Sequence, residues 1–132
     1  MTFKALATAA TALCAILAAV LLIAPNLIYS IFQIPAQDSA DFMSRRAAML
    51  FLGIAVMCST FRLVQDPAAI RAFSAGMVIM MAGLAGVGLF EFARGFAGPG
   101  IFLAIVTEIL FVLGFTRFVK QTPAAPNNPE QS

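Results

Sequence analysis

The sequence predicts an all-α protein: a bundle of four transmembrane helices joined as up-down hairpins, with a short interfacial segment after the first helix. Of the 132 residues, 61% are hydrophobic and only 11% are charged, which lies far outside the balance of a soluble domain. Four apolar stretches each approach the ~20 residues that a helix needs to cross ~30 Å of hydrocarbon. We therefore expect one domain, residues 1–120, followed by a disordered cytoplasmic tail, 121–132, which is rich in proline and polar residues.

The first helix is expected at about 3–24. Its apolar run also resembles a secretory signal, but it is longer than a usual signal core, and the proline at position 25 makes a poor cleavage site. Pro25 can instead serve as the first residue of a short new helix that ends near Ile34. This segment mixes apolar and polar residues, so we expect it to lie at the membrane surface with Tyr29 in the headgroup zone.

The second and third helices are expected at about 41–63 and 67–93. Ser39 or Asp41 is the expected N-cap of the second helix, and Asp66 the N-cap of the third. Because the turn between these helices is short, they should be antiparallel neighbours.

The fourth helix is expected at about 99–119. Gly95 is a typical helix stop, and Gly98-Pro99-Gly100 restarts the chain after a short loop. With four crossings, both termini must lie on one side of the membrane.

The distribution of lysine and arginine predicts which side this is. With the N-terminus inside, five basic residues are cytoplasmic (Lys4, Arg62, Arg71, Arg117 and Lys120) and three are outside (Arg45, Arg46 and Arg94). This excess favours an N-in, C-in orientation.

Glu108 is a carboxylate in an otherwise apolar run from Gly95 to Thr116. Placing a charge at the centre of a membrane helix costs roughly 2.5–3.5 kcal/mol, so such residues usually face a bundle interior, pair with a partner or become protonated. Glu108 lies ~13 Å into the fourth helix at 1.5 Å per residue, and Arg46 enters the second helix from the same membrane face. We therefore expect these two residues to form a charge-assisted hydrogen bond.

The same leaflet should hold further charged residues. The candidate intramembrane polar site consists of Glu108, Arg46, Arg45, Glu91 and Arg94. Each has a plainer interpretation: the two arginines of helix two can extend to the headgroups, Glu91 and Arg94 can be interfacial, and Glu108 can form a structural bond between helices.

The third helix is rich in glycine. Gly76, Gly83, Gly86 and Gly88 recur with alanines at short spacings, a pattern typical of close helix packing in membranes. The glycine-rich segment GLAGVG, residues 83–88, does not resemble a nucleotide-binding loop, because no strand precedes it and no P-loop lysine follows. These four glycines are therefore expected to pack against a neighbouring helix or another subunit.

Composition excludes several functions. The chain has no histidine and only two cysteines, too few ligands for a conventional zinc, haem or iron-sulfur site, so no metal and no cofactor is expected. Without histidine, a Ser/His or Cys/His catalytic set cannot form. A net charge of +2 provides no basic stripe for nucleic acid. The expected partners are the lipid bilayer and a second copy or another membrane protein.

Three features of the chain resemble a known group of proteins. They are the proline-ended first helix with its short amphipathic piece, the segment RRAAMLFLGIAVM, and the segment GPGIFLAIVTEILFVLGF. Together they resemble small four-helix bacterial inner-membrane proteins of unknown function, DoxX-like in the broad sense. The resemblance covers nearly the whole chain, has Arg46 and Glu108 as its markers, and implies a bacterial inner-membrane bundle without implying an activity.

Two classes of function follow from the sequence. The first is a non-enzymatic accessory, assembly or self-associating subunit that uses the glycine face of the third helix. The alternative is a binder or carrier of an apolar molecule or a proton, with Glu108 and Arg46 as its polar groups. An enzyme ranks third, because one carboxylate can act as acid or base but no other catalytic part is evident.

Overall fold

The computed structural model describes residues 2–120, which form five helices. They are α1 (Phe3–Ile23), α2 (Pro25–Phe32), α3 (Asp38–Phe61), α4 (Pro67–Ala93) and α5 (Ile101–Val119). The four long helices are each long and apolar enough to cross a membrane, whereas α2 is a short helix of eight residues. The predicted all-α, four-helix membrane fold is confirmed. The expected disordered tail, 121–132, lies outside the described residues.

Local sequence signals explain where the helices begin. At the start of α4, the Asp66 carboxylate accepts hydrogen bonds from the backbone N–H groups of Ala68 and Ala69 at 3.2 and 3.1 Å, and Pro67 is the first helical residue, as predicted. The predicted cap of α3 is wrong. The helix begins at Asp38, and its N-cap is Gln37, whose side chain makes no capping hydrogen bond. Ser39 and Asp41 therefore lie inside the helix, and Asp41 is in the first turn, where the positive end of the helix dipole stabilises a carboxylate.

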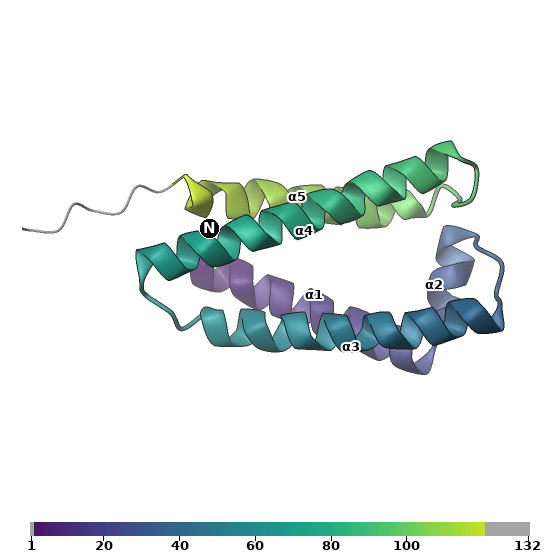
Figure 1. Ribbon diagram of the computed structural model, residues 1–132, viewed down its shortest axis with the longest axis horizontal. Coiled ribbons are helices and arrows are strands. Elements are labelled where there is room, and N and C mark those ends of the chain that lie inside the picture. The colour runs from purple at the N-terminus through teal and green to yellow at the C-terminus, as the bar shows by residue number, and fades with distance from the viewer. Residues whose placement is uncertain (1, 121–132) are drawn as a thin grey trace, which may run out of the picture.

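The long helices form two antiparallel pairs, seen as two layers in Figure 1. Helix α1 packs along α3, and α4 packs along α5, whereas contacts between the two pairs are few. The Phe3 ring at the start of α1 lies 5.4 Å from the Phe118 ring near the end of α5. The N-terminal end of α1 and the C-terminal end of α5 therefore lie on the same side of the bundle, as an even number of crossings requires.

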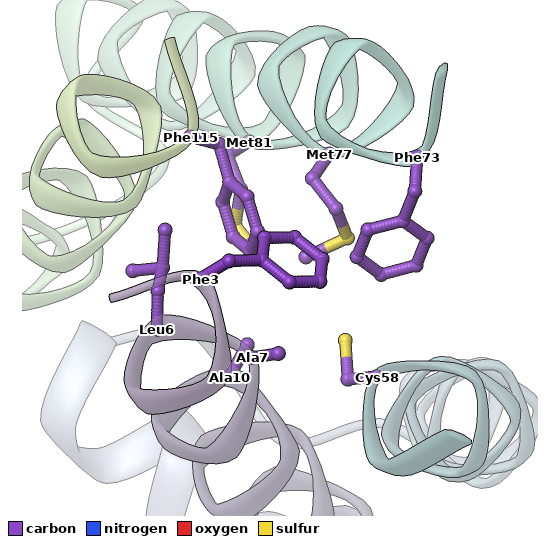
Figure 2. Close-up of a cluster of buried hydrophobic side chains, with 9 residues drawn as sticks. All are labelled: Phe3, Leu6, Ala7, Ala10, Cys58, Phe73, Met77, Met81 and Phe115. Carbon is purple, nitrogen blue, oxygen red and sulfur yellow. The ribbon is translucent and has the colours of Figure 1, made fainter. Parts of the chain in front are cut away.

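The two pairs meet at this side of the bundle, which we call the closed end. Its buried cluster, drawn in Figure 2, comprises Phe3, Leu6, Ala7, Ala10, Cys58, Phe73, Met77, Met81 and Phe115. All four long helices contribute to it. The Phe3 ring packs edge-on against Phe73 and Phe115, with centroids 6.1 and 6.5 Å apart, and Phe61 stacks on Phe73 at 4.4 Å. Ala7 and Ala10 of α1 are fully buried in the same cluster.

At the other side, which we call the open end, α2 lies across the space between the two pairs (Figure 1). Hydrogen bonds connect α2 to both helix pairs. The Tyr29 hydroxyl hydrogen-bonds the Ser44 hydroxyl of α3 at 2.7 Å, and the Gly98 N–H in the α4–α5 loop donates to the Phe32 carbonyl oxygen at 2.7 Å. Tyr29 is therefore buried and bonded within the protein.

The glycines of the α4–α5 loop are required by this contact. A Cβ atom on Gly98 would lie 2.6 Å from the Gln33 side-chain oxygen, and one on Gly100 would collide with the Ile31 carbonyl oxygen. Gly95, which follows α4, has a φ of +73°, a conformation that glycine adopts without strain. The Gly98-Pro99-Gly100 turn thus lets α2 approach the loop backbone directly.

Candidate functional site

Between the two helix pairs, towards the open end, lies an apolar cavity that is only half enclosed by the protein, with two adjoining compartments of about 590 and 340 Å³. Seven residues line both compartments: Leu17, Ile28, Phe32, Phe51, Leu84, Ala104 and Glu108. They come from all five helices. The cavity exists because the pairs are in contact mainly at the closed end, while α2 holds the open end apart.

Glu108 is the one charged residue that lines both compartments. Its Oε2 atom is buried and has no hydrogen-bond partner among residues 2–120. Two other buried side-chain oxygens of the described chain also lack a partner, Asp41 Oδ1 and Ser74 Oγ, but neither residue lines the cavity. An unsatisfied buried polar group costs roughly 1–3 kcal/mol, and more when it is charged.

The position of Glu108 on α5 explains its depth. It lies seven residues after the first residue of the helix, Ile101, hence about 10 Å along the helix axis at 1.5 Å per residue. The neighbouring Thr107 also lines the smaller compartment, but its hydroxyl donates to the Leu103 carbonyl oxygen at 2.8 Å. The Thr107 hydroxyl is therefore already hydrogen-bonded within α5, whereas within the described chain the Glu108 Oε2 atom remains a free hydrogen-bond acceptor in the cavity.

The structure does not bring Arg46 to Glu108. Arg46 is exposed, and its guanidinium carbon lies 5.7 Å from the centre of the Phe42 ring on its own helix. Arg45 is also exposed, and neither arginine lines the cavity. Within residues 2–120 the single ion pair closer than 4.0 Å joins two other residues, Arg94 and Glu91. The expected Arg46–Glu108 hydrogen bond is thus absent from this structure, because the Arg46 guanidinium lies against Phe42 of its own helix and Arg46 does not line the cavity.

Glu91 and Arg94 lie at the rim of the larger compartment. Arg94 Nη1 donates to Glu91 Oε1 at 3.1 Å, and the Arg94 guanidinium also covers the Phe90 ring at 5.4 Å from its centre. Because the arginine side chain is 59% exposed, this pair contributes little to stability. It does neutralise Glu91, so the rim carries a paired carboxylate and the interior an unpaired one.

Of the four glycines expected to pack, one does so within the chain. A Cβ atom on Gly88 would lie 3.2 Å from the Ile105 side chain of α5, which shows close helix packing there. Gly76, Gly83 and Gly86 have no neighbouring atom within 4 Å of such a Cβ and face outwards. The buried face of α4 instead bears larger side chains, such as Met77 and Met81.

The apolar walls of the cavity could not be found from the sequence. Leu17 of α1, Phe32 of α2 and Leu84 of α4 are ordinary apolar residues in apolar segments, and nothing distinguishes them from lipid-facing neighbours. The one usable signal in the sequence is Glu108 itself, because a carboxylate in such a segment requires an internal surface.

Comparisons with known proteins identify no relative: none of the family models, curated proteins or solved structures compared with this chain matches it. The class that the fold defines is therefore a small multi-pass membrane protein. The resemblance to DoxX-like proteins stays a prediction. Within the described residues, no group of three or more His, Cys, Asp or Glu side chains is placed to hold a metal ion.

Proposed function

We propose that this chain is a binding protein or carrier for an apolar small molecule in a bacterial inner membrane, with both termini in the cytoplasm. One observation supports this most directly: an apolar cavity of about 590 Å³ that also contains a carboxylate oxygen without a partner. Ligand sites typically have volumes of roughly 300–1,000 Å³, predominantly apolar walls and a few polar groups that orient the ligand. The bacterial location and the orientation rest on the resemblance and on the five-to-three charge excess.

The contrast between Glu108 and its surroundings favours a ligand over a purely structural role. A structural intramembrane carboxylate joins two helices through a hydrogen bond, and Glu108 Oε2 makes none with the described residues. A polar group kept unpaired in an apolar interior weakens the fold, and proteins commonly accept such a cost at functional sites. In this proposal the missing partner is a group on the ligand.

A self-associating subunit is the second candidate function. It is favoured by the outward position of Gly76, Gly83 and Gly86 on α4, since small residues let a second helix approach closely. In that case the contact would involve the lipid-facing side of α4 and would leave the cavity unexplained. An enzymatic role is less well supported. Besides the Glu108 carboxylate, the described cavity offers the Cys14 thiol and a Thr107 hydroxyl already bonded to its own helix, and no hydrogen bond joins these groups into a catalytic set.

Native mass spectrometry of the protein released from lipid nanodiscs tests the binding function. Ala104 lines both compartments, so Ala104→Phe should fill the cavity from within. The matched control is Val106→Phe, which adds a phenylalanine two residues away at a position that is 54% exposed and outside the cavity. We expect the wild type and Val106→Phe to retain a small molecule that Ala104→Phe loses.

Two results would contradict the proposal. One is a wild-type protein that retains no small molecule. The other is equal retention in the wild type and Ala104→Phe, which would mean that the retained molecule is bulk lipid bound to the outer surface. A shift of the wild type from monomer to dimer, lost in Gly83→Leu, would favour the self-associating subunit.

A further inference from the structure

The polar groups of the cavity define the chemical class of ligand, an inference that rests on the proposed function. The walls are apolar, so the ligand must be mainly hydrocarbon. Of the polar side chains, Thr107 donates to its own helix and Glu91 is paired with Arg94. Cys14 of the smaller compartment adds only a thiol, a weak hydrogen-bond donor. The uncommitted group is the Glu108 carboxylate, which accepts hydrogen bonds and bears a negative charge when ionised.

A lone acceptor in such a cavity distinguishes between ligands by charge. An anionic ligand would place a second negative charge beside Glu108, and a pure hydrocarbon would leave the carboxylate unsatisfied. A ligand with an ammonium group supplies both a compensating charge and hydrogen-bond donors, and in a low-dielectric interior this combination is the strongest available. Arg94 cannot replace it, because its guanidinium is already held at the rim by Glu91 and Phe90.

We propose that the cavity binds a lipophilic cation, specifically an amphipathic amine whose ammonium group contacts Glu108. Glu108 lines both compartments and so lies where they adjoin. The hydrocarbon part of the ligand then extends from this point along apolar walls that include Leu17, Phe32 and Leu84. Hydrogen bonds to charged groups contribute enough that the cation should bind roughly ten- to a hundredfold more tightly than a neutral molecule of equal length.

Photolabelling in zwitterionic phosphatidylcholine nanodiscs tests this inference with three diazirine-bearing probes of equal chain length: dodecylamine, 1-dodecanol and dodecanoate. The neutral lipid removes surface attraction of the amine, and peptide mapping reports which residues are labelled. We expect the amine to label cavity residues such as Ala104 half-maximally at a concentration roughly ten- to a hundredfold below that of the alcohol. Dodecanoate should label them least.

Two variants separate charge from shape. Glu108→Gln retains the size of the side chain but cannot ionise, so the preference for the amine over the alcohol should disappear. Glu108→Asp retains the charge and should preserve most of the preference, which keeps the test decisive even if the glutamine variant folds poorly. The matched control is Asp38→Asn, because Asp38 is exposed in the first turn of α3 and lies outside the cavity.

The outcomes distinguish this inference from the function on which it rests. Equal labelling of the cavity by amine and alcohol, or a preference that survives Glu108→Gln, would overturn the cation inference and leave an apolar binding site. Failure of all three probes to label the cavity would overturn both. Stronger labelling by dodecanoate than by the amine would show that Glu108 does not select by charge.

Discussion

The two ends of the bundle use similar apolar residues in different ways. At the closed end, Phe3, Phe73 and Phe115 lie within 6.5 Å of one another, centre to centre, and Phe115 is fully buried. At the open end, comparable side chains surround about 590 Å³ of space and one unpaired carboxylate oxygen. Both ends are rich in large apolar residues, so hydrophobicity alone does not decide which one packs.

What differs is whether the two helix pairs are in contact. Lipid tails are as apolar as the protein core, so helices in a membrane associate through close packing and hydrogen bonds. The aromatic cluster supplies that packing at the closed end. At the open end the pairs are linked by α2, through Tyr29 to α3 and through Phe32 to the α4–α5 loop. The closed end therefore stabilises the fold, and the open end is available for a ligand.

The largest effect is expected from Phe115→Ala, which removes a fully buried ring from the closed end. Truncating a buried phenylalanine costs on the order of 3 kcal/mol because it removes contacts and leaves a void. Thermal or denaturant unfolding in detergent micelles should show this loss. Phe90→Ala, at a ring that is 59% exposed, is the matched control and should change stability far less. Equal losses in both variants would mean that the closed end is not the stabilising core.

An intermediate effect is expected from Gly100→Leu, which acts on the open end. Its Cβ would collide with the Ile31 carbonyl oxygen, so α2 must move away from the α4–α5 loop. Forcing atoms into a packed contact typically costs about 1–3 kcal/mol. Backbone amide exchange of Gly98, whose N–H bonds Phe32, should become faster while that of the closed end stays slow. Unchanged exchange at Gly98 would show that α2 does not depend on this contact.

A small effect is expected from Gly83→Leu. No atom lies within 4 Å of a Cβ built at this position, so the leucine has space and should improve helix propensity. The free energy of unfolding of the monomer should therefore stay the same or rise by up to about 1 kcal/mol. A loss of stability would instead mean that this side of α4 contacts another helix, and would support the self-associating subunit.

The smallest effect is the coupling between Arg46 and Glu108. Arg46 covers Phe42 and Glu108 faces the cavity, so a double-mutant cycle in unfolding free energy with Arg46→Ala and Glu108→Ala should be additive within about 0.5 kcal/mol. A coupling of several times that size would restore the direct pair that the sequence suggests.

Much of the fold could be predicted because its signals are local. Four apolar runs, the Asp66-Pro67 cap and the Gly95 stop each depend on a few neighbouring residues, and the structure has the helix count and the up-down order that they indicate. The expected packing of the second helix along the third is wrong: α3 and α4 meet through Phe61 and Phe73 near their turn and then diverge, because α3 packs along α1 and α4 along α5.

The site could be predicted only in part. Glu108 stood out in its apolar segment, but its surroundings depend on how the two pairs diverge, which no local pattern encodes. The position of Arg46, against Phe42 and outside the cavity, likewise depends on how the helices pack and not on a local sequence pattern.

The proposed function requires that Glu108 contacts a ligand and does not form a structural bond between helices. The measurement that tests this most directly is the unfolding free energy of Glu108→Leu, compared with the wild type in ligand-free detergent. Because Oε2 has no partner in the described chain, replacing the carboxylate with a hydrocarbon should leave stability unchanged or raise it by about 1 kcal/mol. A loss on the order of 3 kcal/mol, the penalty for breaking a buried pair, would show that Glu108 stabilises the bundle and would contradict the account.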